Sequence, residues 1–202
     1  MTVLDHARLI AVVRYRRASD LAGTVDALHV SGVVVEITLD TPGALAAIAA
    51  ASERRVPIGA GTVLDADGVR ACADAGAGFV VSPGLVDDVV ETALELGLEP
   101  VPGIATATEL MRAQALGARV CKVFPAASLG GPAFIRLLRS PFPDARLVAV
   151  GGIEVADIRS YLEAGATAVA LGRGLVGADA PADEAALAAL AERAAAAAET
   201  AR

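Results

Sequence analysis

One lysine and one glutamate are the strongest candidates for chemistry in this sequence. Lys122 is the only lysine of the chain, and the other sixteen fixed cationic side chains are all arginines. It stands in the apolar stretch RVCKVFPAAS. A lysine can lose its proton and attack a carbonyl carbon, which an arginine cannot do. Because burial lowers the pKa of a lysine, we predict that Lys122 is a nucleophile that forms a Schiff base.

Glu36 is the best candidate for a general acid and base. In the stretch VVVEITL, strand alternation puts Glu36 on the same face as Thr38. If Lys122 also points inward, the two charges lie at neighbouring heights. A buried ion pair that only neutralises charge is the structural alternative. His6 and His29 are the only histidines and neither ends an apolar run, so Glu36 has little competition for proton transfer.

Two glycine-rich segments predict an anion site. Gly151 and Gly152 end one apolar run, and Gly172, Arg173 and Gly174 end the next. Backbone N–H groups of such loops often bind phosphate, and glycine lets the chain approach an anion closely. A plain turn, with Arg173 in solvent, is the structural alternative.

The elements that must position these residues repeat along the chain. Eight short apolar runs alternate with amphipathic stretches, as expected of strands buried on both faces and joined by helices. The runs are Leu9–Arg14, Val33–Leu39, Val56–Thr62, Phe79–Pro83, Glu99–Ile104, Val120–Pro125, Arg146–Gly152 and Ala168–Gly172. Predicted helix starts include Ser19 and Thr41 with Pro42, and predicted helix ends are Gly32, Gly97, Gly117 and Gly165.

Eight such units predict one α/β domain over residues 1–202, a (β/α)8 TIM barrel of eight parallel strands. An Ala-rich C-terminal helix is expected over about 181–202. An open doubly wound sheet would need a glycine-rich loop after the first strand, where the sequence reads RYRRAS. In a barrel, the carboxyl ends of the strands form the active site. These ends also carry Arg14, Thr62, Pro83 and Phe124.

Composition excludes several functions. The formal net charge of −7 argues against a nucleic-acid partner and against an anionic membrane surface. No apolar stretch is long enough for a transmembrane helix, and the N-terminus lacks the pattern of a signal peptide. Cys72 and Cys121 are too few for a disulfide framework or a metal cluster. We therefore expect a cytoplasmic protein that acts on a small molecule, without membrane or nucleic acid.

Six stretches resemble the 2-keto-3-deoxy-6-phosphogluconate and 2-keto-3-deoxy-6-phosphogalactonate aldolases, class I enzymes of sugar-acid breakdown. They are VVEITL, IGAGTVL, VVSPGL, PGIATATEL, CKVFPA and AVGGI, within about residues 8–177. The resemblance implies a Schiff-base lysine at Lys122 and an acid/base glutamate at Glu36. It further implies substrate contacts at Thr62, Pro83 and Phe124, and phosphate near Gly151, Gly152 and residues 172–174. It also implies a cytoplasmic homotrimer that needs neither metal nor cofactor.

Two positions depart from the family pattern. Gluconate-branch members typically carry a carboxylate-binding arginine four residues after the glutamate, where this chain has Asp40. Arg14 is the predicted replacement, and its context IAVVR is similar to the galactonate branch, as is Val150. Arg173 stands where a serine is frequent. Both sugar-acid epimers, and 4-hydroxy-2-oxoglutarate, stay open as substrates.

The predicted reaction is cleavage of a 2-keto-3-deoxy-6-phospho sugar acid to pyruvate and glyceraldehyde 3-phosphate. Arg14 and Thr62 would bind the carboxylate, and Arg173 with the glycine loops the phosphate. One rival is another phosphate-binding barrel enzyme, of the thiamine-phosphate synthase or epimerase type. That class normally needs Mg²⁺ ligands or an aspartate pair at strand ends, and only Asp40 lies near one. The other rival is a sugar-phosphate binder without catalysis.

Overall fold

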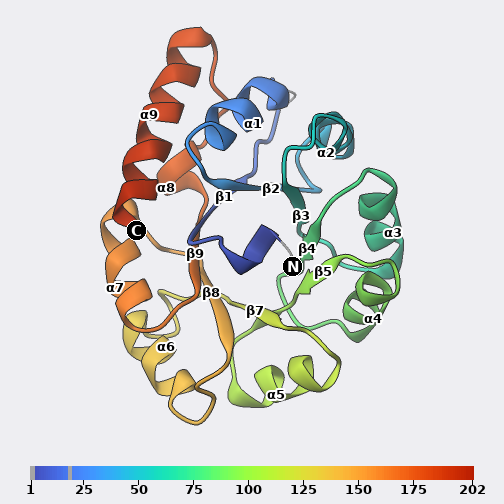
Figure 1. Cartoon of the computed structure of the whole chain (residues 1–202), viewed down its shortest axis with the longest axis vertical. Coiled ribbons are helices and arrows are strands. Elements are labelled where there is room, and N and C mark those ends of the chain that lie inside the picture. Colours follow the sequence, from blue (N-terminus) through green and yellow to red (C-terminus); the bar gives the residue numbers. More distant parts are fainter. Residues whose placement is uncertain (1–2, 18–19) are drawn as a thin grey trace.

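The computed structural model describes residues 3–17 and 20–202 and shows a ring of parallel strands surrounded by helices (Figure 1). This confirms the predicted single-domain α/β barrel. The strands are β1 (Leu9–Val13), β2 (Val34–Thr38), β3 (Ile58–Gly61), β4 (Phe79–Val81), β5 (Glu99–Val101), β6 (Gly103–Ile104), β7 (Val120–Val123), β8 (Arg146–Val150) and β9 (Ala168–Leu171). Their order in the sheet is β5-β4-β3-β2-β1-β9-β8-β7-β6.

The predicted number of eight strands is wrong, because the fifth strand is divided in two. β5 pairs with β4, and β6 pairs with β7. Pro102 separates them, and a proline has no N–H to donate to a strand ladder. Its carbonyl oxygen still accepts a hydrogen bond from Lys122 N at 2.9 Å. The described residues therefore form nine strand segments, and the ring passes from β4 to β7 through one stretch of backbone.

Most strands end before the polar residues that follow them. The predicted runs extended one or two residues too far at their carboxyl ends, so Arg14, Thr62 and Pro83 lie just beyond β1, β3 and β4. Phe124 likewise follows β7. These side chains therefore belong to the loops that carry sites in barrels of this kind.

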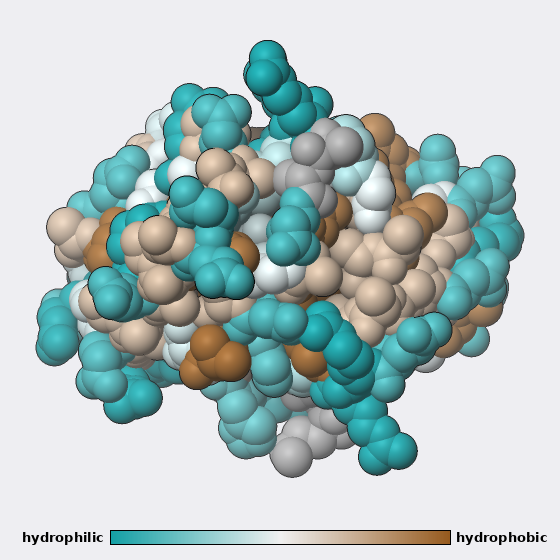
Figure 2. Space-filling view, turned by 90° about the horizontal axis from the view of Figure 1, so that it is seen from above, coloured by the Kyte–Doolittle hydropathy of each residue, from teal (hydrophilic) through white to brown (hydrophobic). Residues whose placement is uncertain are grey.

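Helices alternate with the strands and cover the outside of the ring (Figure 1). They are α1 (Leu21–His29), α2 (Ala44–Glu53), α3 (Ala66–Asp74), α4 (Asp87–Glu95), α5 (Ala107–Ala115), α6 (Pro132–Arg139), α7 (Ile158–Glu163), α8 (Arg173–Val176) and α9 (Glu184–Thr200). Two short 3-10 helices are η1 (Val3–Asp5) and η2 (Val155–Asp157). On the face drawn in Figure 2, hydrophilic side chains project around smaller apolar patches. Within the described ranges, none of the helices has the length and hydropathy of a membrane span.

The predicted helix ends were confirmed, but one predicted helix start was wrong. The four predicted C-terminal glycines, at positions 32, 97, 117 and 165, all have positive φ, which confirms them as helix ends. The prediction that α2 starts at Thr41 with Pro42 is wrong, because α2 begins after Gly43, whose φ is 82°. Thr41 instead accepts a hydrogen bond from Tyr15 N at 3.3 Å. Ser19 lies outside the described residues, and the side chain of Asp20 caps α1.

Two hydrophobic clusters separate the inside of the ring from the layer under the helices. Val120, Val148 and Phe79 belong to the inner cluster. Cys121 and Val123 belong to the larger cluster between strands and helices. Since neighbouring residues of a strand point to opposite faces, Lys122 must share the inner face with Val120. This confirms the predicted orientation of β7.

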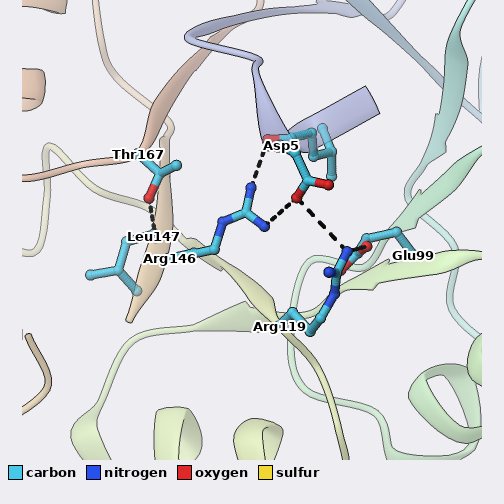
Figure 3. A network of polar contacts seen from close by, with 7 residues as sticks. Asp5, Glu99, Arg119, Arg146, Leu147 and Thr167 are labelled. Carbon is cyan, nitrogen blue, oxygen red and sulfur yellow. Dashed lines mark hydrogen bonds and ion pairs between the residues drawn. The ribbon is translucent and has the colours of Figure 1, made fainter. Parts of the chain in front are cut away.

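The N-terminal segment seals one end of the barrel. Leu4 and Ala7 pack into the inner cluster. Figure 3 shows Asp5 between two guanidinium groups, with Arg146 Nη1 at 2.7 Å and Arg119 Nη2 at 3.9 Å. Arg119 also forms a close ion pair with Glu99. All these partners lie where strands begin, so the amino-terminal end of the ring is closed, and a ligand must enter at the carboxyl end.

Candidate active site

A cavity of about 620 Å³ lies where the strands end. It is lined by every residue that the sequence singled out for the site: Arg14, Glu36, Thr62, Pro83, Lys122, Phe124, Gly151, Gly152, Gly172 and Arg173. Parallel strands end at the same edge of a sheet, and closing the sheet into a ring brings those ends together. The fold thus gathers the predicted residues around one space, and their individual roles stay predictions.

Lys122 and Glu36 are both buried at the bottom of this cavity. Lys122 is 8% exposed and Glu36 is 3% exposed. Neither a hydrogen bond nor an ion pair joins these two described side chains, so the predicted alternative of a direct ion pair is not formed. Lys122 Nζ lies 4.7 Å from the centre of the Phe124 ring. The lysine nitrogen therefore borders the cavity without being held by a carboxylate.

Burial moves both pKa values toward the neutral forms. Desolvation lowers the pKa of Lys122 from its ordinary 10.5, Glu36 acts against this shift, and Arg14 adds to it. Desolvation raises the pKa of Glu36 from its ordinary 4.5, and the charges of Lys122 and Arg14 act against that shift. An amine that loses its proton more easily lies near a carboxyl group that holds its proton more tightly. This arrangement suits nucleophilic attack followed by proton transfer.

On β3, Gly61 makes the space that Glu36 occupies and Gly59 makes space for Phe79. A Cβ atom at Gly61 would lie 1.9 Å from Glu36 Oε1. One at Gly59 would lie 2.3 Å from the ring of Phe79. Both glycines pair with β2, Gly59 opposite Glu36 and Gly61 opposite Thr38. Sequence analysis gave Gly61 no role, although the run IGAGT among β-branched strands was the available signal.

Arg14 and Thr62 meet at one side of the cavity mouth. Arg14 Nη2 donates a hydrogen bond to Thr62 Oγ1 at 2.6 Å. Thr62 has a φ of 58°, a left-handed conformation that is rare for a β-branched residue. Arg14 Nε also lies 3.4 Å from Asp40 Oδ2. Asp40, which departs from the family pattern, therefore contacts Arg14, the arginine predicted to bind the carboxylate instead.

The glycine-rich loops form the other side of the cavity. Gly151 and Gly152 have φ values of 99° and 71°. A Cβ atom at Gly151 would lie 3.0 Å from the ring of Phe124. Arg173 begins the short helix α8, and no hydrogen bond or ion pair with another described residue holds its side chain. An exposed cation beside close-packed glycine backbone suits an anionic group.

Sequence analysis missed two charged residues that line the same cavity. Arg16 and Glu154 both border it. Arg16 belongs to the stretch RYRR directly after β1, and Glu154 comes two residues after the glycine pair. A Cβ atom at Gly174 would lie 2.6 Å from Glu154 Oε2, so this carboxylate lies against the second glycine loop. The cavity lining thus carries the carboxylate of Glu154 as well as the guanidinium groups of Arg16 and Arg173.

Acidic, cysteine and histidine side chains do not gather in the described part of the chain. No group of three or more of them there is arranged to hold a metal ion. The polar side chains around the cavity are instead one amine, the buried carboxyl group of Glu36, the carboxylate of Glu154, the hydroxyl group of Thr62 and several guanidinium groups. These groups can attack a carbonyl, move protons and bind anions.

Comparison with known proteins identifies the family. The family model of KDPG and KHG aldolases matches residues 1–190. This chain belongs to that aldolase family. Its members are carbon–carbon lyases, so the protein is an enzyme of this class. Over 164 residues it is 41% identical to the 2-dehydro-3-deoxy-phosphogluconate aldolase of Pseudomonas aeruginosa, covering 80% of this chain and 74% of that protein.

The galactonate branch is also among the relatives. The 2-dehydro-3-deoxy-6-phosphogalactonate aldolase of Escherichia coli K12 is 34% identical, covering 83% of each chain. A solved KDPG aldolase from Legionella pneumophila holds pyruvate captured as a covalent carbinolamine intermediate. It superimposes with a TM-score of 0.84 at 28% identity, over 96% of this chain and 95% of that one.

The rival barrel enzyme shares only the fold. A thiamine phosphate pyrophosphorylase from Pyrococcus furiosus superimposes with a TM-score of 0.67, but the identity is 17%. It covers 97% of this chain and 99% of that one. The comparisons therefore favour the aldolase over a thiamine-phosphate synthase or an epimerase.

Proposed function

We propose that this protein is a class I aldolase that cleaves a 2-keto-3-deoxy-6-phospho sugar acid to pyruvate and glyceraldehyde 3-phosphate. The observation that carries the proposal is the position of Lys122. It is the only lysine, it is buried beside Glu36 in the cavity, its pKa is lowered mainly by burial, and no ion pair holds its nitrogen. A lysine in this state is a nucleophile for a ketone.

The first half of the reaction makes the carbon–nitrogen bond. The neutral amine of Lys122 attacks the C2 ketone and forms a carbinolamine. Glu36, directly or through a water molecule, delivers the proton with which the C2 hydroxyl group leaves as water. The product is an iminium ion, which withdraws electrons from C3. The raised pKa of Glu36, caused by burial, supports this role because its protonated form persists at higher pH.

The second half breaks the carbon–carbon bond. The carboxylate of Glu36 takes the proton of the C4 hydroxyl group, and the C3–C4 electron pair moves into the iminium ion. Glyceraldehyde 3-phosphate leaves as the aldehyde and an enamine stays on Lys122. Protonation of the enamine at C3 restores the iminium ion. Water then hydrolyses it, which releases pyruvate and the free amine.

The two sides of the cavity would hold the two anionic ends of the substrate. Arg14 and Thr62, joined at 2.6 Å, would bind the carboxylate. Arg173 with the loops at 151–152 and 172–174 would bind the phosphate, and Arg16 is a further cation that lines the cavity. Pro83 and Phe124 would flank the imine, and the Phe124 ring, 4.7 Å from Lys122 Nζ, would keep water from it.

Assembly and location follow the family. We propose a cytoplasmic homotrimer, as the resemblance implies. Large apolar side chains on the surface of the protomer support burial against a second copy. Val30, Leu137, Met111 and Leu64 are 77%, 73%, 58% and 57% exposed. Light scattering on the purified protein tests the proposal, since a mass of one or two chains of 20.2 kDa would contradict it.

Trapping with borohydride tests the chemistry. The protein is incubated with pyruvate, reduced, and weighed intact. One reduced pyruvyl group, located on Lys122 by peptide mapping, is the expected result. Absence of an adduct under conditions that label a known class I aldolase would rule the mechanism out. Stabilisation by a sugar phosphate without any adduct or turnover would indicate a binder instead.

Assays with both C4 epimers and with 4-hydroxy-2-oxoglutarate then define the substrate. We expect cleavage of at least one phosphorylated epimer. Faster cleavage of 4-hydroxy-2-oxoglutarate than of either phosphorylated acid would contradict the phosphate role of Arg173 and the glycine loops.

A further inference from the structure

The turn after β2 holds Arg14 by its backbone. The hydroxyl groups of Thr38 and Thr41 lie 3.3 Å and 3.5 Å from the carbonyl oxygen of Val13, the residue before Arg14. Tyr15, the residue after it, donates its N–H to Thr41 Oγ1 at 3.3 Å. Both chain neighbours of Arg14 are therefore fixed to the end of β2.

The same turn also holds the guanidinium group. Arg14 Nε lies 3.4 Å from Thr38 Oγ1 and 3.4 Å from Asp40 Oδ2. From the loop after β3, Thr62 accepts from Nη2 at 2.6 Å. A guanidinium has five N–H donors, so three of them have no partner among the residues that the structure describes.

Arg14 borders the cavity, whereas Asp40 and Thr38 do not. Asp40 therefore reaches a ligand only through Arg14. Its carboxylate contacts Nε, so the edge formed by Nη1 and Nη2 is the one left to bind a carboxylate through two parallel hydrogen bonds. A planar group that is oriented before the ligand arrives loses less entropy on binding.

We propose that Asp40 is a positioning residue, which orients the guanidinium of Arg14 so that its free edge faces the carboxylate of the keto acid. This inference rests on the proposed function, because it assumes that Arg14 binds that carboxylate. It gives Asp40 a role in recognition, although a carboxylate cannot itself bind the acid end of the substrate.

Stability of the fold is the competing explanation for this ion pair. The side chains of Arg14 and Asp40 are 55% and 53% exposed. Ion pairs with such exposure contribute little to folding. Removing the Asp40 carboxylate should therefore change the affinity for a keto acid more than it changes the melting temperature.

The chain offers a matched control for the same chemical change. Asp67 pairs with Arg70 at 2.8 Å on α3, and their side chains are 94% and 58% exposed. Neither residue borders the cavity. Asp67→Asn and Asp67→Ala therefore remove an exposed ion pair of similar kind without contact to Arg14.

The experiment measures borohydride trapping of pyruvate in the full-length protein as a function of pyruvate concentration. For Asp40→Ala we expect the half-saturating concentration to rise roughly 5- to 20-fold, with a maximal trapping rate within about twofold of the unaltered protein. Asp40→Asn retains an oxygen that can accept from Nε, so it should recover part of that loss. The Asp67 variants should match the unaltered protein.

A second background tests whether Asp40 acts through Arg14. In an Arg14→Ala protein, adding Asp40→Ala should change the half-saturating concentration by less than about twofold, because the residue that it positions is gone. A full additional loss in that background overturns the inference. So does an Asp40→Ala protein that saturates like the unaltered one.

These results are separate from a failure of the proposed function. If the unaltered protein forms no pyruvyl adduct, the aldolase mechanism fails and this inference falls with it. If the unaltered protein forms the adduct but the Asp40 variants saturate normally, the mechanism stands and only the inference is rejected. Melting temperatures of all variants, measured in parallel, exclude misfolding as the cause of a loss.

Discussion

The two ends of the barrel use charge in opposite ways. At the amino-terminal end, Asp5 and Glu99 are paired with Arg146 and Arg119 (Figure 3), and Leu4 of the short 3-10 helix η1 packs into the inner cluster. At the carboxyl end, Lys122 is buried with no ion pair. The same strands thus begin among paired charges and end around a buried amine that has no ion pair within the described residues.

Side-chain volume differs between the ends as well. The inner cluster contains the large side chain of Phe79, the first residue of β4. At the carboxyl ends of the strands, a Cβ atom added at Gly61, Gly151 or Gly174 would crowd Glu36, Phe124 or Glu154, so glycine at these positions makes room for those side chains. The difference indicates that the closed end serves stability, whereas the open end keeps a cavity and a buried amine, without an ion pair to the described part of the chain, for chemistry. The following variants test that division.

The largest effect is expected from Lys122→Arg. It retains the positive charge and removes the nucleophile, so trapping of pyruvate should be lost and cleavage should fall by roughly 10⁴-fold or more. Arg119→Lys makes the reverse exchange at the closed end and should leave cleavage within about twofold. Cleavage by Lys122→Arg at a rate within tenfold of the unaltered protein would remove the Schiff-base mechanism.

The next effect is expected from Glu36→Gln, which should slow cleavage by roughly 10²- to 10³-fold because proton transfer is lost. The pH dependence of pyruvate trapping tests the electrostatic effect of Glu36 on Lys122. Trapping by the unaltered protein should rise with pH and level off at the pKa of Lys122, which burial lowers below 10.5. The charge of Glu36 raises the pKa of Lys122, so Glu36→Gln should move this rise of the trapping rate, the limb of the pH profile, to lower pH.

Arg14→Gln should shift the pH dependence of pyruvate trapping in the opposite direction. The charge of Arg14 lowers the pKa of Lys122, so its removal should move the same limb to higher pH. Trapping rates measured across the pH range for the three proteins check both shifts. Movement of both limbs in one direction would contradict the electrostatic account of the open end.

A smaller effect is expected from Gly61→Ala. The added Cβ atom would lie 1.9 Å from Glu36 Oε1, so Glu36 must move and cleavage should fall by roughly 10²-fold. Gly78→Ala, before β4 at the closed end, adds a Cβ atom at an ordinary 3.6 Å from Ile58 O. Its cleavage rate should stay within about twofold. Equal losses in the two variants would show that β3 and β4 tolerate no added volume at either end.

The smallest effect is expected from Thr62→Gly. Thr62 and Arg55 are the described non-glycine residues with positive φ, at 58° and 60°. Glycine adopts this conformation without strain. The free energy of unfolding of each glycine variant should therefore equal that of the unaltered protein or exceed it by up to about 1 kcal/mol. Only Thr62→Gly removes the acceptor for Arg14, and its half-saturating pyruvate concentration should rise about 3- to 10-fold. A similar rise in Arg55→Gly would contradict a local role for Thr62.

Local patterns in the sequence determined the repeating units, the inward orientation of Lys122 and Glu36, and the glycine helix ends. Each depends on strand alternation, hydrophobic period or backbone freedom, which act over a few residues. The split of the fifth strand was not predicted, because it depends on the residues before and after Pro102 pairing with two different strands of the ring. The predicted start of α2 was wrong because Thr41 accepts a hydrogen bond from Tyr15, in the segment after β1, instead of capping the helix.

The sequence by itself determined which residues could do chemistry: a single lysine, a strand glutamate and two glycine loops at strand ends. Only the tertiary structure decided which of them meet. The contact of Arg14 with Thr62 and Asp40, the space that Gly61 gives to Glu36, and the presence of Arg16 and Glu154 at the cavity all join separate β–α units. Distances across a barrel are fixed by how the ring closes, and no pattern within one unit contains them.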